Sequence, residues 1–233
     1  MSQTYSPEPE ALRVPGMAVG ARATFIVRTY NHLFGAIVAF TLLEILYFTS
    51  GIAEPVARAM MSVPWLLVLG AFMVVSWMAS RFAHNVASVG SQYLGLGLYV
   101  VAQSVLFIPL LFVANYYAPG AIESAAAITL LGFAALTGIA FWTRKDFSFL
   151  GSVLRWGMIV ALLAIVGGAI FGFQLGTFFV VGMIGLAGAA ILHDTSNVIH
   201  HFPEDRYVGA ALQLFASVAL MFWYVLSLFI SRD

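Results

Sequence analysis

Long apolar runs separated by short polar interruptions dominate the chain from about residue 32 onward. Seven such runs occur, at about 32–50, 64–82, 92–115, 122–142, 153–172, 177–200 and 207–230. A helix needs about 20 mostly apolar residues to cross the roughly 30 Å hydrocarbon core of a bilayer. The pattern therefore predicts an all-α membrane protein with seven membrane-spanning helices.

The boundary between the fifth and sixth runs is the least marked, because residues 156–192 are almost unbroken apolar sequence. As a single helix this segment would be about 55 Å long, nearly two bilayer cores. The segment must therefore fold back, and only residues 172–176 carry turn-forming chemistry. Six spans with one re-entrant segment is the alternative.

Composition supports a membrane setting and narrows the possible functions. Hydrophobic residues make up 62% of the chain and charged residues 9%, against roughly 25% charged residues in a soluble domain. The ten basic residues balance the ten acidic ones, so no overall field attracts nucleic acid, and the lipid bilayer is the expected partner. The absence of cysteine excludes disulfides, thiol catalysis and cysteine-ligated metals.

The first 22 residues differ in composition from the rest of the chain. They are polar, contain Pro7, Pro9 and Pro15, and have few large apolar side chains. Such a segment cannot bury enough apolar surface to offset the entropy lost on ordering. We predict a short disordered tail over residues 1–22 and a single seven-helix transmembrane domain over 23–233.

Basic residues predict the orientation, because loops rich in Lys and Arg stay in the cytoplasm. With the N-terminus inside, the cytoplasmic segments hold eight of the ten basic residues: Arg13, Arg22, Arg28, Arg81, Arg144, Lys145, Arg155 and Arg206. The opposite side holds only Arg58 and Arg232. We therefore predict a cytoplasmic N-terminus and, with seven spans, a C-terminus outside.

Four ionisable residues lie within or at the edges of the predicted spans: His32, Glu44, Arg81 and Asp194. A charge at mid-bilayer costs at least about 2.5–3.5 kcal/mol, so each needs a partner, a water path or neutralisation. Arg81 and Asp194 fall on the same side, and an ion pair between them is possible, either as a functional latch or as a structural or exposed pair. Glu44 is either a neutral hydrogen-bonding acid or a group that lines a water path, and His32 is expected at the interface.

The histidines near Asp194 are candidate metal ligands by residue type. His193 and His200 would lie about 10.5 Å apart along a continuous helix, too far to bind one ion. A His-Glu-x-x-His motif is absent from the sequence. We therefore predict no metal site and no resident cofactor, and an enzyme is the least favoured class.

Three motifs resemble the Bax inhibitor-1, or transmembrane Bax inhibitor motif, family in its bacterial branch. They are "FIVRTYNHLFGAIVAF" at 25–40, "FWTRKDFSFLGSVL" at 141–154 and "ILHDT" at 191–195. The second contains the Thr-x-Lys-Asp-Phe-Ser pattern of the family, with Thr143, Lys145 and Asp146 as its first members. The resemblance implies a seven-helix bundle with the last helix at its centre, in a bacterial inner membrane, and a pH-sensitive calcium leak.

The resemblance also implies roles for individual residues. In the family, two aspartates in the last two helices share a proton, and an arginine of the second helix latches one of them. Asp194 matches the first aspartate and Arg81 the arginine, but Ser217 stands where the second aspartate is expected. Because serine does not titrate in this way, Asp194 is expected to stay paired with Arg81 opposite Ser217, or His193 supplies a different pH response.

These observations predict a cation leak channel, with calcium as the transported ion and altered pH gating. The alternative, implied for some bacterial relatives, is a non-conducting regulator that binds a membrane protease or another membrane complex. Loss of the second aspartate favours the regulator, and retention of Asp194 and Arg81 favours the channel.

Overall fold

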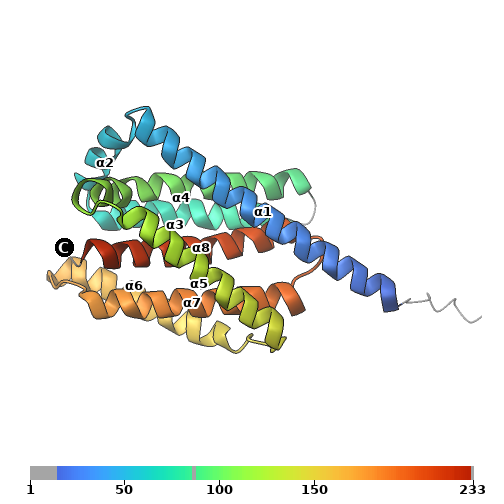
Figure 1. The fold of residues 1–233 in the computed structure, drawn as a ribbon. Helices are drawn as coiled ribbons and strands as arrows, with labels where there is room; N and C mark the ends of the chain where they lie inside the picture. Colours follow the sequence, from blue (N-terminus) through green and yellow to red (C-terminus); the bar gives the residue numbers. More distant parts are fainter. Residues whose placement is uncertain (1–14, 86–87, 232–233) are drawn as a thin grey trace, which may run out of the picture.

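The computed structural model describes residues 15–85 and 88–231, and within them the fold is all-α (Figure 1). Eight helices make up this described part of the chain: α1 Pro15–Thr49, α2 Ala53–Met61, α3 Trp65–Ala83, α4 Val89–Tyr117, α5 Ala121–Thr143, α6 Leu150–Phe171, α7 Thr177–His200 and α8 Tyr207–Ile230. Seven of them, all but α2, are long and apolar enough to cross a membrane. The seven predicted spans are therefore confirmed.

The weakest predicted boundary lies where residues 172–176 leave the helical conformation. Gly172 ends α6 with a positive φ of 75°, and its N–H donates to the carbonyl of Gly168 at 2.9 Å. Glycine adopts this left-handed conformation without the steric cost that a side chain brings. The turn separates α6 from α7 as two full helices, which excludes the alternative of six spans with a re-entrant segment.

The first helix is longer than the apolar run suggests. It begins at Pro15, whereas the sequence predicted a disordered tail as far as residue 22. Proline is favoured in the first turn of a helix, because its missing N–H has no partner there in any case. Residues 1–14 lie outside the described part of the chain, so the remainder of the predicted tail stays a prediction.

Helix α2 was missed by the sequence analysis, which placed no helix between the apolar runs at 32–50 and 64–82. Its nine residues are too few for a span. Ala53 and Ala57 are buried against Ile108 of α4, and Arg58 pairs with Glu54 one turn earlier on the exposed side. Small residues on one face and an i,i+4 charge pair on the other stabilise a short helix at the end of the bundle.

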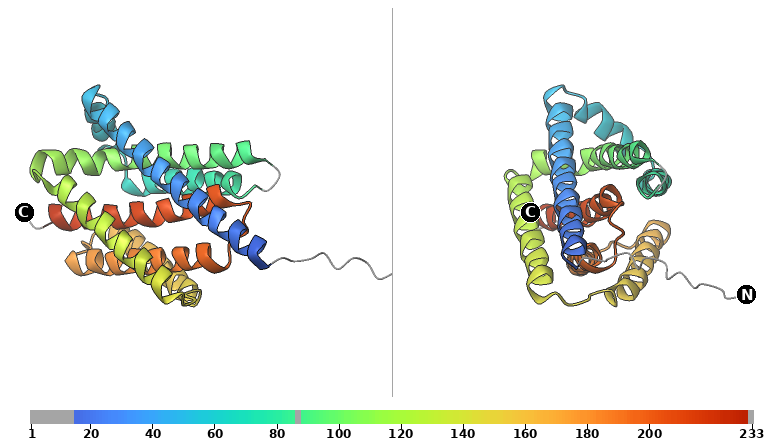
Figure 2. Two further views of the ribbon diagram at one scale, coloured as in Figure 1. Left: turned by 45° about the vertical axis from the view of Figure 1, so that its right-hand side comes forward. Right: turned by 90° about the vertical axis from the view of Figure 1, so that its right-hand side faces the viewer.

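Helix α8 lies at the centre of the bundle and packs against α1, α3, α4, α5 and α7 (Figure 2). Its buried residues occur along its whole length, from Val208 to Leu226. Helix α6, in contrast, packs closely only against α7 among the described helices, and Ala161 is its one buried residue there. The expectation of a central last helix is confirmed.

The tightest helix contact joins α3 and α4. A Cβ added at Gly95 would lie 2.4 Å from the backbone nitrogen of Ala83 and 2.5 Å from the carbonyl oxygen of Ala79. Both alanines are fully buried. Within a bilayer, helices associate through close packing of this kind, because lipid is as apolar as the side chains. The contact also fixes which face of α3 points into the bundle.

Candidate functional site

Asp194 is buried inside the bundle and is held by two side chains of α8. Its exposed fraction is 4%. The amide Nε2 of Gln213 donates to Oδ1 at 2.7 Å, and the hydroxyl of Ser217 donates to Oδ2 at 2.5 Å. Gln213 and Ser217 are one helical turn apart and therefore lie on the same face of α8. The expected meeting of Ser217 with Asp194 is thus observed.

The predicted ion pair between Arg81 and Asp194 is wrong. Arg81 is exposed, and its guanidinium lies over the ring of Trp77, 4.5 Å from the ring centroid. No ion pair joins it to Asp194 in the described structure.

The packing of α3 explains why Arg81 points away. The fully buried Ala79 and Ala83 form the inward face of α3 at this end. Arg81 lies two residues from each of them, which places it on the opposite side of a helix with 3.6 residues per turn. Hydropathy gave the depth of Arg81 in the membrane, but only the packing decides its direction.

A cavity of about 960 Å³ lies beside Asp194, with walls from α3, α4, α6, α7 and α8. Most of its lining is apolar. The polar side chains at its surface are those of Gln103, Asp194, Gln213 and Ser217, together with the two tyrosines Tyr99 and Tyr224. The buried carboxylate therefore borders a largely apolar cavity.

Glu44 and His32 do not belong to this cavity. Glu44 is 8% exposed, and neither of its carboxyl oxygens has a hydrogen-bond partner among the described residues. His32, midway along α1, bonds the carbonyl of Arg28 at 2.7 Å and the hydroxyl of Tyr93, near the start of α4, at 2.8 Å. The structure thus does not bring Glu44 together with Asp194, and His32 lies near one end of the bundle.

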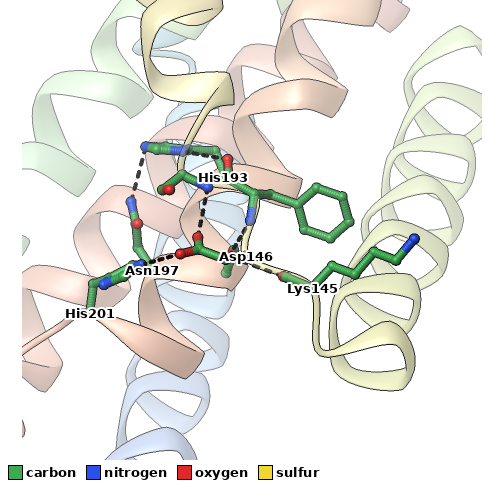
Figure 3. A network of polar contacts seen from close by, with 8 residues as sticks. Lys145, Asp146, His193, Asn197 and His201 are labelled. Atoms are coloured by element: carbon green, nitrogen blue, oxygen red, sulfur yellow. Dashed lines mark hydrogen bonds and ion pairs between the residues drawn. The ribbon is translucent and has the colours of Figure 1, made fainter.

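The loop between α5 and α6 docks on the end of α7 that carries Asp194 (Figure 3). The backbone N–H of Phe147 donates to the hydroxyl of Ser196 at 2.9 Å. Nδ1 of His193 lies 3.2 Å from the Phe147 carbonyl oxygen, and Nε2 lies 3.0 Å from the amide nitrogen of Asn197. The carbonyl is an acceptor and the amide nitrogen a donor, so both ring nitrogens have partners. His193 therefore helps to hold the loop against α7.

Asp146 holds the same loop from the other side. Its Oδ1 accepts from the backbone N–H of Ser148 at 2.9 Å, and its Oδ2 pairs with Nε2 of His201 at 3.0 Å (Figure 3). The Ser148 N–H, followed by the His201 imidazole, lowers the pKa of the Asp146 carboxyl from its ordinary value. Both interactions stabilise the charged carboxylate.

The other two motif residues shape the loop through local contacts. The hydroxyl of Thr143 donates to the Ile139 carbonyl at 2.8 Å in the last turn of α5, and the carbonyl of Lys145 lies 3.5 Å from the Ser196 hydroxyl. Thr143, Lys145 and Asp146 therefore form a structured connection to α7, apart from the cavity.

Sequence reasoning missed Gln213, Ser196 and Asn197. A signal was present for two of them: Gln213 precedes Ser217 by one helical turn in an otherwise apolar run, and Asn197 follows His193 by one turn. Polar residues at this spacing share a face. Ser196 gave no such signal, because its partner is a backbone group of a distant loop.

The sequence of this chain is similar to a known protein family and to several known proteins. A family model described as "Inhibitor of apoptosis-promoting Bax1" matches residues 22–233. The modulator of FtsH protease YccA of Escherichia coli strain K12 is 35% identical over 45% of this chain and 49% of that protein. Protein LIFEGUARD 4 of Arabidopsis thaliana is 31% identical over 59% of this chain and 57% of that protein. An uncharacterized protein of Pseudomonas aeruginosa is 35% identical over 46% and 49%, so the chain spans about half the length of these curated relatives.

Proposed function

The chain belongs to the Bax inhibitor-1 family, and from this premise we propose that it forms a leak pathway for cations, with calcium as the transported ion. The observation that carries the proposal is the carboxylate of Asp194, which is buried beside a cavity of about 960 Å³. An ionisable group buried in a transmembrane bundle is expensive and typically marks an ion path. The inner membrane of a bacterium is the proposed location.

The chemistry of the site suits passage of a cation better than its retention. Calcium takes six to eight oxygen ligands, and the cavity offers one carboxylate together with the neutral oxygens of Ser217, Gln213 and Gln103. The Gln103 oxygen is buried without a hydrogen-bond partner among the described residues. Conduction requires binding that is weak enough for the ion to leave.

Gating in this chain would differ from proton sharing between two carboxylates. Ser217 is the hydrogen-bond donor to Asp194 and carries no titratable carboxyl. Arg81 is not positioned to latch the site. We propose that the position of α7, set by the loop between α5 and α6, controls access to Asp194.

Calcium flux into liposomes that contain the purified protein and an enclosed indicator tests the pathway. Native protein should raise the flux above that of protein-free liposomes, and Asp194→Asn should remove most of the increase. The matched control is Glu44→Gln, which makes the same change at a buried carboxyl outside the cavity. Equal losses in both variants, or no flux from native protein, would contradict a pathway through Asp194.

The second candidate function is regulation of a membrane protease, and one relative favours it: the Escherichia coli protein at 35% identity is named as a modulator of FtsH protease. In cells, expression of this chain would then slow degradation of a membrane substrate by an FtsH-type protease. Slowed degradation together with flux no higher than that of protein-free liposomes would favour the regulator over the channel.

A further inference from the structure

The cavity beside Asp194 lies between two helices that do not pack closely on each other. Leu69, Phe72 and Met73 line it from α3, and Met158, Leu162 and Ile165 line it from α6. Among the described helices, α3 packs mainly against α4 and α8, and α6 packs against α7 (Figure 2, right). Both walls are apolar, so an apolar group can pack against them without removing a polar group from water.

The charge within this cavity is unbalanced. Asp194 is the one acidic side chain among its described lining residues, and Lys, Arg and His are absent from that lining. Gln213 and Ser217 occupy one acceptor position on each carboxylate oxygen. A carboxylate offers about four such positions, so Asp194 can still accept hydrogen bonds from a donor that enters the cavity.

Aromatic side chains also form part of the cavity wall. Trp65 and Trp223 stack with ring centroids 5.8 Å apart, and Phe72 and Tyr99 lie 6.1 Å apart. All four contribute to the cavity wall. These rings extend the apolar part of the wall, which an alkyl chain can contact.

The volume limits the size of the occupant. About 960 Å³ lies at the upper end of the roughly 300–1,000 Å³ range of small-ligand pockets. The cavity is therefore of a size that suits one small molecule.

We propose that this cavity binds a lipophilic amine, with the protonated amine on Asp194 and a single alkyl chain between α3 and α6. The ammonium group supplies the positive charge that the lining lacks, and its N–H groups donate to the free acceptor positions of the carboxylate. The inference goes beyond the proposed leak, because binding requires no conduction. Where the leak operates, the bound amine occupies its carboxylate and blocks it.

The test compares two probes of equal chain length, dodecylamine and dodecanol, with protein in phosphatidylcholine nanodiscs at pH 7. Trp65 and Trp223 line the cavity, so tryptophan fluorescence reports binding. Native protein should give a saturable change, with the amine binding at least about tenfold more tightly than the alcohol, because the alcohol can donate one hydrogen bond to Asp194 but carries no charge to balance the carboxylate. Nanodiscs without protein give the background partitioning.

Asp194→Asn should remove the preference for the amine, and Glu44→Gln should retain it. A second variant, Ala190→Leu, fills the lining one turn before Asp194 and should weaken both probes while leaving the carboxylate in place. Equal affinity of native protein for amine and alcohol, or an unchanged preference in Asp194→Asn, would overturn the proposal. Flux in liposomes is scored separately, so a binding protein without flux refutes the leak alone, and flux without amine preference refutes the amine site alone.

Discussion

At the scale of single residues, the contact between Asp194 and Ser217 distinguishes this chain from a bundle with two carboxylates at the same place. The hydroxyl donates to Oδ2 at 2.5 Å, so the position of Ser217 is adjacent to the carboxylate. A hydroxyl donor supports one charge state of Asp194 without adding a second proton site. The native site is therefore expected to titrate as a single carboxyl group.

Ser217→Asp should convert this site into a pair of carboxylates. Two such groups in contact share a proton and titrate as a coupled unit, so the pH dependence of calcium flux between about pH 5 and 8 should differ from that of the native protein. Flux measured in liposomes over this range checks the prediction. Ser217→Asn, which brings no titratable group, is the control, and an identical pH profile in both variants would contradict coupling to Asp194.

Asp194 and the two residues expected beside it show what sequence can predict at this scale. Ser217 and Asp194 were placed together because both carry family positions in adjacent helices, and the structure confirms the contact. Arg81 was placed with them on its depth and its match to the family arginine, and it lies on the other side of α3. Rotating a helix about its axis leaves its hydropathy almost unchanged, so hydropathy does not show which face of α3 points into the bundle. The buried small residues Ala79 and Ala83 mark that face.

At the scale of elements, close packing of α3 on α4 depends on a single glycine. A Cβ at position 95 would meet backbone atoms at 2.4 and 2.5 Å, and backbone cannot move aside as a flexible side chain can. Glycine recurs at every third position in part of α7, at Gly182, Gly185 and Gly188. Only Gly188 of these three has atoms within 4 Å of an added Cβ. Spacing alone therefore does not identify the helix face in contact.

Gly95→Ala should separate α3 from α4 and lower the stability of the bundle by about 1–3 kcal/mol, the usual cost of overpacking. Gly97→Ala is the matched control, because a Cβ there has no atom within 4 Å, and alanine is the better helix former. Unfolding in detergent, followed by circular dichroism, compares the two. A smaller loss for Gly95→Ala than for Gly97→Ala would contradict the close approach.

The loop that carries Asp146 should loosen in acid. The lowered pKa of Asp146 means that the folded loop favours the charged carboxylate. Its contribution is present above the ordinary carboxyl value of about 3.9 and is lost as pH falls through the lower folded value. Hydrogen exchange at the amides of Phe147 and Ser148, corrected for intrinsic rates, should increase in that range. In Asp146→Asn this pH dependence should disappear, and its persistence would assign it to another group.

The elements that the sequence predicted well are those marked by a continuous run of apolar residues. All seven spans are present, because the cost of burying polar groups in lipid sets their length. Helix α2 and the docking of the loop between α5 and α6 were missed, since both depend on contacts between distant segments, such as Phe147 with Ser196. The cavity was missed for the same reason, because five helices form its walls.

At the scale of the whole molecule, the basic residues gather at one end of the bundle. The start of α1 and the α3–α4, α5–α6 and α7–α8 connections lie at this end (Figure 1). Arg22 ties two of these segments together, since its Nε donates to the Ile199 carbonyl at 3.0 Å and its Nη1 to the Phe202 carbonyl at 2.5 Å. Arg58, in α2, lies at the opposite end. Arg13 and Arg232 are outside the described residues.

This asymmetry predicts that the end with the loop between α5 and α6 faces the cytoplasm, because short loops rich in Lys and Arg are not translocated. A single cysteine at Ser148 should then be shielded from an impermeant thiol reagent in intact cells and react after permeabilisation. A cysteine at Ser62, after α2 at the opposite end, is the matched control and should react in intact cells. The chain has no native cysteine to interfere. A reporter fused after Asp233 should be active outside. Labelling of the cysteine at position 148 but not of that at position 62 in intact cells would contradict the predicted orientation. It would place the end of α7 that carries Asp194 on the outer side.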